Sequence, residues 1–440
     1  MTSRNNSSLT LDPIKKCSGS VSLPGSKSIS NRALLLAALS SGVTELHGLL
    51  DSDDISVMLN SLDRCGVKVE RLGGGKVRVH GVYPFPITEA DLFMGNAGTA
   101  IRPLTGALAI MGGNYTLSGV PRMHERPIKD LADALIYMGA QIKYLQSEGY
   151  PPIHIGASNI NKNEVTVKGN VSSQFLTSLL MAAPLAARKI GTDIHIKVDG
   201  ELISIPYINI TLKTMQRFGV SVKRYGWQHF VISANAEYVS PLTFQVEGDA
   251  SSASYFMALA TLGGGPLKID GAGSASVQGD IAFADVVKEM GATVQYDENS
   301  ITVVGPGVSE GVLLRAFDRD FNHIPDAAMT AAVMALFADG PCLLRNIGSW
   351  RVKETDRIDA MHSELERLGA KVESGPDWLK VYPMEHNQWR SANIKTYDDH
   401  RMAMCFSLAA FGPVPVTILD PSCVSKTFPE YFDVYKTLVA

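Results

Sequence analysis

The sequence predicts an α/β protein of two domains, built from six copies of one helix–strand unit. Its 440 residues are too many for one ordinary hydrophobic core, so at least two domains are expected. A helix-like segment that opens on small or polar residues and continues in Ala, Leu and Met occurs six times. Three units per domain is the natural division of six. The sequence therefore predicts domains at 22–246 and at 1–21 with 247–440, the second being discontinuous.

The six openings set the repeat, because their starts are separated by 70, 76, 78, 74 and 75 residues. They are GSKSISNRALLLAAL from Gly25, GNAGTAIRPLTGAL from Gly95, VSSQFLTSLLMAA from Val171, DASSASYFMALA from Asp249, HIPDAAMTAAVMAL from His323 and DDHRMAMCFSLAA from Asp398. A turn and a strand-like run follow, as in GTDIHIKV from Gly191. This regularity exceeds what an arbitrary alternation of helices and strands would give.

A second amphipathic segment closes each of the first five units at a glycine, followed by alternating apolar residues. The endings are CGVKV, MGAQI, FGVSV, MGATV and LGAKV, starting at Cys65, Met138, Phe218, Met290 and Leu368. Glycine at this place predicts a left-handed helix cap before a strand. The sixth unit stops inside its second helix, TFPEYFDVYKTLVA. The LTLDP segment near the N-terminus could pair back with the second domain.

Composition narrows the class of function. Hydrophobic residues make up 45% and charged residues 19%, with a net charge of −4, which does not favour a general nucleic-acid binder. The polar N-terminal segment lacks the apolar core of a signal peptide, and the longest apolar stretch near it, Ala33–Leu39, is far too short for a membrane helix. Five scattered cysteines without a C-x-x-C pair indicate a reduced, cytoplasmic protein. No zinc-ligand spacing and no P-loop occur, so neither a metal nor a nucleotide site is predicted.

Unusual polar residues gather at the openings, where helix N-termini favour bound anions. The cations are Lys27, Arg32, Arg126, Lys353, Arg357, Arg401 and Lys426. Spacing places Ser28 and Arg32 one turn apart on a helix, and likewise Lys353 and Arg357. The sequence therefore predicts a binding site for anionic ligands.

Structural alternatives stay open for single residues. Asp326 could be a first-turn acid favoured by the helix dipole, Ser172 and Ser173 could be helix caps, and Glu354 could form an ordinary ion pair with Arg357. Asn96, Gly98 and Thr99 could form a simple turn.

The motifs together resemble the EPSP synthase family, in its bacterial form typically sensitive to glyphosate. LPGSKSISNRALLLAAL, GNAGTAIRPL, PRMHERPI, VSSQFLTSLLMAAPL, GDASSASYF, NHIPDAAM, WRVKETDR and DDHRMAMC occur in the order of that family, over nearly the whole chain. The resemblance implies the enolpyruvyl transferase fold, with three βαβαββ units in each of two domains that close on each other. It also implies transfer of the enolpyruvyl group of phosphoenolpyruvate to the 5-hydroxyl of shikimate 3-phosphate, without metal or organic cofactor.

The resemblance also implies residue roles. For phosphoenolpyruvate they are Lys27, Asn96, Gly98, Arg126, Gln174, Arg357, Arg401 and Lys426. For shikimate 3-phosphate they are Lys27, Ser28, Arg32, Ser172, Ser173, Gln174, Ser204, Tyr207, Asp326, Ser349 and Lys353. Asp326 and Glu354 are the candidates for proton transfer, with Lys27 assisting. A cytoplasmic monomer that binds these two substrates and glyphosate, but no nucleic acid or membrane, is expected.

Two positions depart from the family pattern, and three rival functions remain. Ser349 stands where some members have Asn, and His124 where Lys is frequent. The main rival is an enolpyruvyl transferase acting on UDP-N-acetylglucosamine, which as a rule uses a loop cysteine that the Arg126 segment lacks. An RNA-phosphate cyclase would need an adenylate-accepting histidine and a basic face. A non-catalytic anion-binding module is the third.

Overall fold

The computed structural model describes residues 8–309 and 311–440, which form two compact units. The first, here called the continuous unit, runs from Gly25 to Glu247. The second, the split unit, combines the chain up to Pro24 with Gly248–Ala440. The repeats predict these crossings near residues 22 and 247, and residues 1–7 of the predicted range 1–21 lie outside the described residues.

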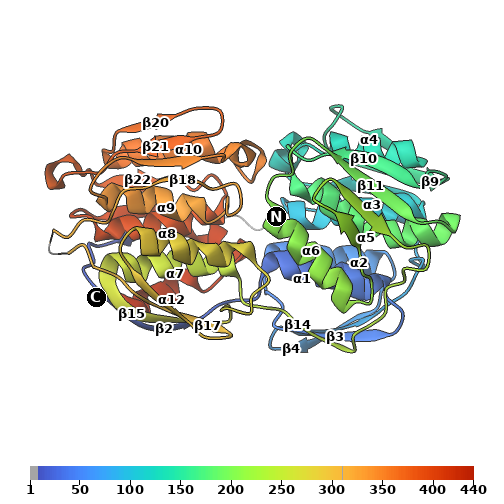
Figure 1. The fold of residues 1–440 in the computed structure, drawn as a ribbon, viewed down its shortest axis with the longest axis horizontal. Helices are drawn as coiled ribbons and strands as arrows, with labels where there is room; N and C mark the ends of the chain where they lie inside the picture. Colours follow the sequence, from blue (N-terminus) through green and yellow to red (C-terminus); the bar gives the residue numbers. More distant parts are fainter. Residues whose placement is uncertain (1–7, 310) are drawn as a thin grey trace. The chain divides into compact units, whose positions relative to one another are not determined.

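The continuous unit contains three four-stranded sheets with six α-helices (Figure 1). The sheets, in strand order, are β14-β3-β5-β4, β6-β7-β9-β8 and β10-β11-β13-β12. The strands are β3 (Val43–His47), β4 (Val69–Gly73), β5 (Lys76–His80), β6 (Glu89–Phe93), β7 (Asn114–Ser118), β8 (Ala140–Tyr144), β9 (Ile153–Ser158), β10 (Glu164–Lys168), β11 (Ile194–Asp199), β12 (Lys223–Tyr225), β13 (His229–Ile232) and β14 (Thr243–Gln245). The helices are α1 (Lys27–Leu39), α2 (Asp53–Arg64), α3 (Gly98–Met111), α4 (Lys129–Met138), α5 (Ser173–Ile190) and α6 (Ile205–Arg217), with a 3-10 turn η1 (Pro121–Glu125).

The split unit repeats this plan with sheets β16-β17-β15-β2, β18-β19-β21-β20 and β1-β23-β22. Its strands are β1 (Ser8–Leu11), β2 (Cys17–Ser22), β15 (Gly264–Asp270), β16 (Thr293–Tyr296), β17 (Ser300–Val304), β18 (Asp318–Asp320), β19 (Cys342–Arg345), β20 (Val372–Ser374), β21 (Leu379–Val381), β22 (Ala392–Ile394) and β23 (Val416–Leu419). Its α-helices are α7 (Ala250–Gly263), α8 (Phe283–Glu289), α9 (Ala328–Met334), α10 (Arg357–Leu368), α11 (His400–Phe406) and α12 (Tyr431–Leu438). Its 3-10 turns are η2 (Gly279–Ala282), η3 (Ala335–Phe337), η4 (Gly348–Val352), η5 (His386–Gln388), η6 (Ser407–Phe411) and η7 (Pro421–Lys426).

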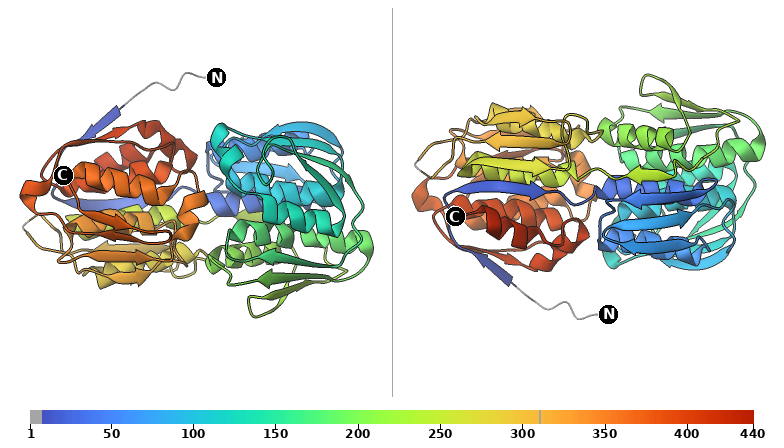
Figure 2. Two further views of the ribbon diagram at one scale, coloured as in Figure 1. Left: turned by 90° about the horizontal axis from the view of Figure 1, so that it is seen from above. Right: turned by 90° about the horizontal axis from the view of Figure 1, so that it is seen from below.

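Strands distant in the sequence complete a sheet in each unit. In the continuous unit β14 pairs in parallel with β3, so the end of the third repeat returns to the first sheet. In the split unit β2 pairs in parallel with β15. Strand β1, part of the LTLDP segment, pairs antiparallel with β23, and Figure 2 shows this blue strand beside the red C-terminal part of the chain. This pairing joins the N-terminal segment to the C-terminal repeat.

The six predicted openings all form helices, which are α1, α3, α5, α7, α9 and α11. They make up the interior of the two units, and α7 is buried along its whole length. Helices α9 and α11 are short, and each continues as a 3-10 turn, η3 and η6. A helix buried on all sides needs apolar or small residues all around, which explains the Ala, Leu and Met content of these segments.

The predicted glycine caps are confirmed. The glycines of the five repeat endings all have positive φ, at Gly66 (85°), Gly139 (112°), Gly219 (86°), Gly291 (117°) and Gly369 (108°). A side chain is strained in this conformation, so glycine ends each helix and releases the chain into the next strand. Within the described residues, no helix is both long and apolar enough to cross a lipid bilayer.

Candidate active site

In the continuous unit, Arg32 is a buried cation held by neutral oxygen atoms. Its Nε donates to Thr211 Oγ1 at 2.9 Å, Nη1 to the carbonyl of Ser28 at 2.8 Å, and Nη2 to Thr177 Oγ1 and the Tyr207 carbonyl, both at 3.3 Å. Burial lowers the pKa of Arg32 to about 10. Since no carboxylate within residues 8–309 and 311–440 pairs with this guanidinium, an anionic ligand would stabilise it.

The turn before α3 is built around two arginines. Arg126, 3% exposed, donates from Nη1 to the backbone carbonyl of Asn96 at 2.8 Å and to its Oδ1 at 2.9 Å. Arg102 donates from Nη1 to Gln174 Oε1 at 2.7 Å. Gly98, the first residue of α3, leaves room for both, because a Cβ there would lie 2.5 Å from Arg126 Nη2 and 2.6 Å from Arg102 Nη1. The structure thus gives Asn96 and Gly98 a role beyond a simple turn.

The remaining expected residues of this unit lie at the starts of α1, α5 and α6. Lys27 begins α1, and its Nζ lies 3.5 Å from Asp54 Oδ2. Ser172 is the N-cap of α5 and accepts from the backbone N–H of Gln174 at 3.3 Å, so the helix-cap reading holds for Ser172. Ser204 is the N-cap residue of α6, with a φ of 55°. The others are Ser28, in the first turn of α1, Ser173, the first residue of α5, and Tyr207, in the first turn of α6.

In the split unit, Asp326 is the centre of a cluster of cations. Its Oδ1 lies 2.9 Å from Arg357 Nη1 and 3.5 Å from Lys353 Nζ, and its Oδ2 lies 2.9 Å from Arg401 Nη2. Burial alone would raise the pKa of Asp326, but Arg401, Lys353 and Arg357 outweigh it and hold that pKa well below its usual range. The carboxylate lies in the turn before α9 and binds cations, which contradicts the reading of Asp326 as a first-turn acid of that helix.

Arg357 connects Asp326 to the second carboxylate, Glu354. Its Nη2 lies 3.0 Å from Glu354 Oε2, which confirms the predicted i,i+3 pair, and its Nε lies 2.7 Å from Asp399 Oδ2. Burial would lower the pKa of Arg357, but Asp399, Glu354 and Asp326 together raise it. Lys426 in η7 approaches the other oxygen of Glu354, with Nζ 3.7 Å from Oε1. Both proton-transfer candidates therefore belong to one buried ionic network.

The predicted shared helix of Lys353 and Arg357 is wrong. Lys353 follows the 3-10 turn η4, with φ −85° and ψ −158°, whereas Arg357 is the first residue of α10. The spacing of four residues predicts one helical turn, but an extended bend separates the two residues. They still meet at Asp326 Oδ1. Burial lowers the pKa of Lys353, opposed by Asp326. Ser349 lies half-buried in η4.

Sequence reasoning missed three buried residues that position predicted site residues, two of them in the split unit and one in the continuous unit. Asp399 is the N-cap of α11 and binds Arg357 as well as the backbone N–H of Arg401. Tyr255 accepts a hydrogen bond from Arg401, and Arg102 bonds Gln174. Comparison of the openings could have found Asp399, because Ser172 and Asp249 cap α5 and α7 through the same residue-plus-two contact.

Another missed residue is Asp280, a buried acid in η2 that contacts the first turn of α7. The hydroxyl of Ser251 donates to its Oδ2. Burial raises the pKa of Asp280 to about 6, and the negative charge of Asp326 adds to this effect. The positive charge of Arg401 acts in the opposite direction. Between about pH 4 and pH 6, the Asp280 carboxyl group is therefore protonated in the folded protein but ionised in the unfolded chain.

A pH-dependent stability follows for Asp280→Asn. An acid with a raised pKa destabilises the fold as pH rises through the folded pKa, whereas asparagine keeps an acceptor for Ser251 without charge. The variant should exceed wild type in free energy of unfolding by roughly 2–3 kcal/mol at pH 8, with the difference disappearing below about pH 4. Urea denaturation at both pH values measures it. Asp285→Asn, at an exposed acid of α8, supplies the control, and its free energy of unfolding should stay within about 0.5 kcal/mol of wild type at both pH values. An equal difference at both pH values would disprove the interpretation.

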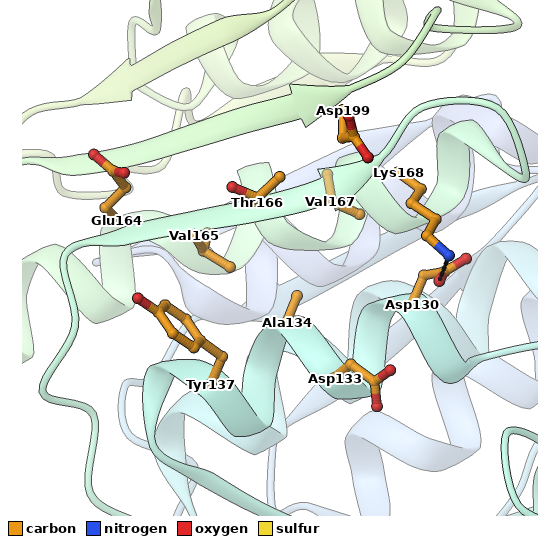
Figure 3. Close-up of a pocket in the computed structure, with 10 residues that line it drawn as sticks. All are labelled: Asp130, Asp133, Ala134, Tyr137, Glu164, Val165, Thr166, Val167, Lys168 and Asp199. Atoms are coloured by element: carbon orange, nitrogen blue, oxygen red, sulfur yellow. Dashed lines mark ion pairs between the residues drawn. The ribbon is translucent and has the colours of Figure 1, made fainter.

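A groove elsewhere in the continuous unit does not match the expected chemistry. It has a volume of about 390 Å³, lies between α4 and β10, and contains none of the predicted residues (Figure 3). Its rim carries Asp130, Asp133, Glu164 and Asp199, with Lys168 Nζ 3.7 Å from Asp130 Oδ1. Anionic substrates would be repelled there.

The cysteines do not resemble a reactive loop cysteine. All five are buried, and burial raises the pKa of each thiol, to about 11 for Cys17 and about 12 for Cys65, Cys342 and Cys405. The pKa of Cys423 is raised for the same reason. A nucleophilic thiol needs the opposite shift, which argues against the rival that uses a loop cysteine.

Comparison with solved structures gives the fold. The EPSP synthase from Acinetobacter baumannii matches with a TM-score of 0.79 at 24% identity, covering 99% of this chain and 98% of the other. An enolpyruvyl transferase from Streptomyces tendae matches with a TM-score of 0.74 at 16% identity, over 99% and 98% of the two chains. At these identities the likeness shows the fold, which is that of the enolpyruvyl transferases.

Sequence comparison gives the particular family. The EPSP synthase (3-phosphoshikimate 1-carboxyvinyltransferase) family matches residues 11–435. Proteins named 3-phosphoshikimate 1-carboxyvinyltransferase are 62% identical in Bordetella avium and 63% identical in Bordetella pertussis, each over 98% of both chains. A third, from Paraburkholderia phytofirmans, is 56% identical over 98% of this chain and 99% of its own. The chain belongs to the EPSP synthase family and is an enzyme.

Proposed function

We propose that this chain transfers the enolpyruvyl group of phosphoenolpyruvate to the 5-hydroxyl of shikimate 3-phosphate, with the residues described above. The hydroxyl oxygen forms a bond to C2 of phosphoenolpyruvate and loses its proton, while C3 gains a proton and becomes a methyl group. In the tetrahedral intermediate, the bond from C2 to the phosphate oxygen then breaks as the methyl group loses a proton. The products are 5-enolpyruvylshikimate 3-phosphate and phosphate, in the shikimate pathway that leads to aromatic amino acids.

The two units contribute different parts of the proposed binding sites. We assign to phosphoenolpyruvate Lys27, Asn96, Gly98, Arg126 and Gln174 of the continuous unit, and Arg357, Arg401 and Lys426 of the split unit. We assign to shikimate 3-phosphate Lys27, Ser28, Arg32, Ser172, Ser173, Gln174, Ser204 and Tyr207 of the continuous unit, and Asp326, Ser349 and Lys353 of the split unit. Guanidinium groups suit this task because their forked N–H donors match the oxygens of carboxylate and phosphate.

Asp326 and Glu354 are assigned to proton transfer, with Lys27 assisting. The cations around Asp326 keep it ionised, so it can accept a proton, but they also make it a weak base. Anionic substrates that bind Arg401 and Lys353 would compete for these cations and raise the proton affinity of the carboxylate. Binding of the substrates would in this way activate the base at the moment it is needed.

The observation that carries the proposal is the partly buried carboxylate of Asp326 in contact with three cations. Such a cluster combines anion binding with a group for proton transfer. The test is release of inorganic phosphate from purified enzyme with both substrates, and separately with each one alone. Release only with the pair is expected. Release with UDP-N-acetylglucosamine in place of shikimate 3-phosphate, or no release with the pair, would refute it.

Inhibition by glyphosate, and its dependence on Gly98, is a further part of the proposal. Glyphosate carries a carboxylate and a phosphonate, so it can use the cations assigned to phosphoenolpyruvate. A methyl group at Gly98 would lie 2.5 Å from Arg126 Nη2 and 2.6 Å from Arg102 Nη1, so both guanidinium groups must move. Gly98→Ala should therefore weaken glyphosate inhibition by at least about tenfold, with a smaller loss of phosphoenolpyruvate affinity.

Inhibition kinetics with phosphoenolpyruvate varied would measure this effect. Gly340→Ala is a matched control, because a Cβ at Gly340 would meet nothing closer than 3.5 Å. The placement of Gly98 fails if wild type is not inhibited, or if Gly98→Ala is as sensitive as wild type.

We also propose that the enzyme is a cytoplasmic monomer. Size-exclusion chromatography with light scattering would test its oligomeric state.

A further inference from the structure

Helix α7 presents polar side chains to the interior of the split unit. Each of these side chains reaches a different element: Ser251 donates to Asp280 in η2, Ser254 Oγ lies 2.9 Å from Thr330 Oγ1 in α9, and Tyr255 accepts from Arg401 in α11. Burying a hydroxyl group costs free energy unless it is hydrogen-bonded, so a wholly buried helix would otherwise be apolar. The polar side of α7 therefore fixes the positions of the elements around Asp326 and Arg401.

The contact between Tyr255 and Arg401 is the one that reaches the proposed anion site. Arg401 Nη1 donates to the hydroxyl oxygen of Tyr255 at 3.1 Å, and Nη2 lies 2.9 Å from Asp326 Oδ2. The Tyr255 ring is fully buried and packs edge-on against Tyr431, with ring centres 5.9 Å apart. The guanidinium of Arg401 is thus held by Asp326 on one side and by Tyr255 on the other. The hydroxyl oxygen of Tyr255 is fixed in place because its ring is packed in the core.

Tyr255 presents a neutral hydroxyl group to Arg401, whereas Arg357 is surrounded by carboxylates. Arg357 is held by the carboxylates of Asp326, Glu354 and Asp399, which neutralise its charge. Burial raises the pKa of Tyr255 well above its ordinary value, against attraction by Arg401, so its hydroxyl stays neutral. A neutral acceptor orients a guanidinium without cancelling its positive charge.

We infer that Tyr255 is a positioning residue that orients the guanidinium of Arg401 toward an anionic group of phosphoenolpyruvate without adding a second negative charge to that of Asp326. The inference rests on the proposed function, which assigns Arg401 to that ligand. Tyr255 touches neither substrate in this scheme and acts through Arg401 alone. It follows that loss of the hydroxyl should affect one substrate and not the other.

Tyr255→Phe tests this, because it removes one oxygen atom and keeps the ring. The KM for phosphoenolpyruvate should rise roughly tenfold, while the KM for shikimate 3-phosphate stays within about twofold of wild type. Tyr435→Phe is a matched control in the same unit, since the buried Tyr435 hydroxyl donates to the Ser407 carbonyl at 3.0 Å. Both variants should lose some thermal stability, but the control should keep both KM values.

A double-mutant cycle with Arg401→Lys separates this inference from the proposed function. If Tyr255 acts through Arg401, Tyr255→Phe should have little further effect in the Arg401→Lys background. A raised KM for phosphoenolpyruvate in Arg401→Lys with a wild-type value in Tyr255→Phe would overturn the positioning role alone. Additive effects of the two substitutions would overturn it too. A wild-type KM in Arg401→Lys would instead refute the assignment of Arg401 in the proposed function.

Discussion

Asp326→Asn should lower kcat by roughly 10²-fold or more while shikimate 3-phosphate still binds detectably. The carboxamide keeps the size and polarity of the side chain but cannot accept the proton. It also removes the negative charge shared by Arg357, Lys353 and Arg401, so binding of anionic ligands can even become tighter. Steady-state kinetics combined with calorimetric binding of shikimate 3-phosphate would separate the two effects.

The matched control for this substitution is Asp356→Asn. Asp356 is also an ion-paired carboxylate of the split unit, 2.9 Å from Arg351 Nη1, and it caps α10. Asparagine is a good N-cap, so this variant should fold and keep near-wild-type kcat. A fully active Asp326→Asn enzyme would exclude Asp326 from proton transfer and leave its carboxylate a role in holding the cations.

Arg126→Ala should reduce kcat/KM for phosphoenolpyruvate by roughly 10²- to 10³-fold, equivalent to about 3–4 kcal/mol of transition-state stabilisation. Arg126 is almost completely buried and is oriented by both oxygens of Asn96, so its guanidinium needs little reorganisation before it binds an anion. Truncation would leave a charged group of the substrate without its forked donor.

Arg122 supplies the control, because it lies in the same segment but pairs with exposed Glu125 at 2.9 Å. Arg122→Ala should change kcat/KM by less than about twofold, as expected for a surface ion pair. Steady-state kinetics on both variants, with circular dichroism to check folding, would complete the comparison. Equal and small effects of the two substitutions would remove Arg126 from the phosphoenolpyruvate site.

The repeat, and the places where the predicted site residues gather, are evident from the amino-acid sequence alone. Ala-rich and Leu-rich openings at regular spacing specify buried helices, because only such segments can be covered on all sides. The five glycines that end the second helices specify left-handed caps, since other residues are strained there. Residues such as Lys27, Gly98 and Arg401 could be located at helix starts from this periodicity alone.

Which side chains contact one another depends on how the folded chain packs. Asp326 contacts residues 27, 31 and 75 positions further along the chain, and no local pattern encodes such distances. The return of β14 to β3, and of β2 to β15, likewise depends on closure of the whole sheet.

Lys353 and Arg357 show where local spacing misleads, because a bend replaced the expected helical turn. The roles of Asp399, Asp280 and Tyr255 were not evident from the sequence for a related reason. A buried polar residue takes its function from its partner, and that partner is brought to it by packing of the core.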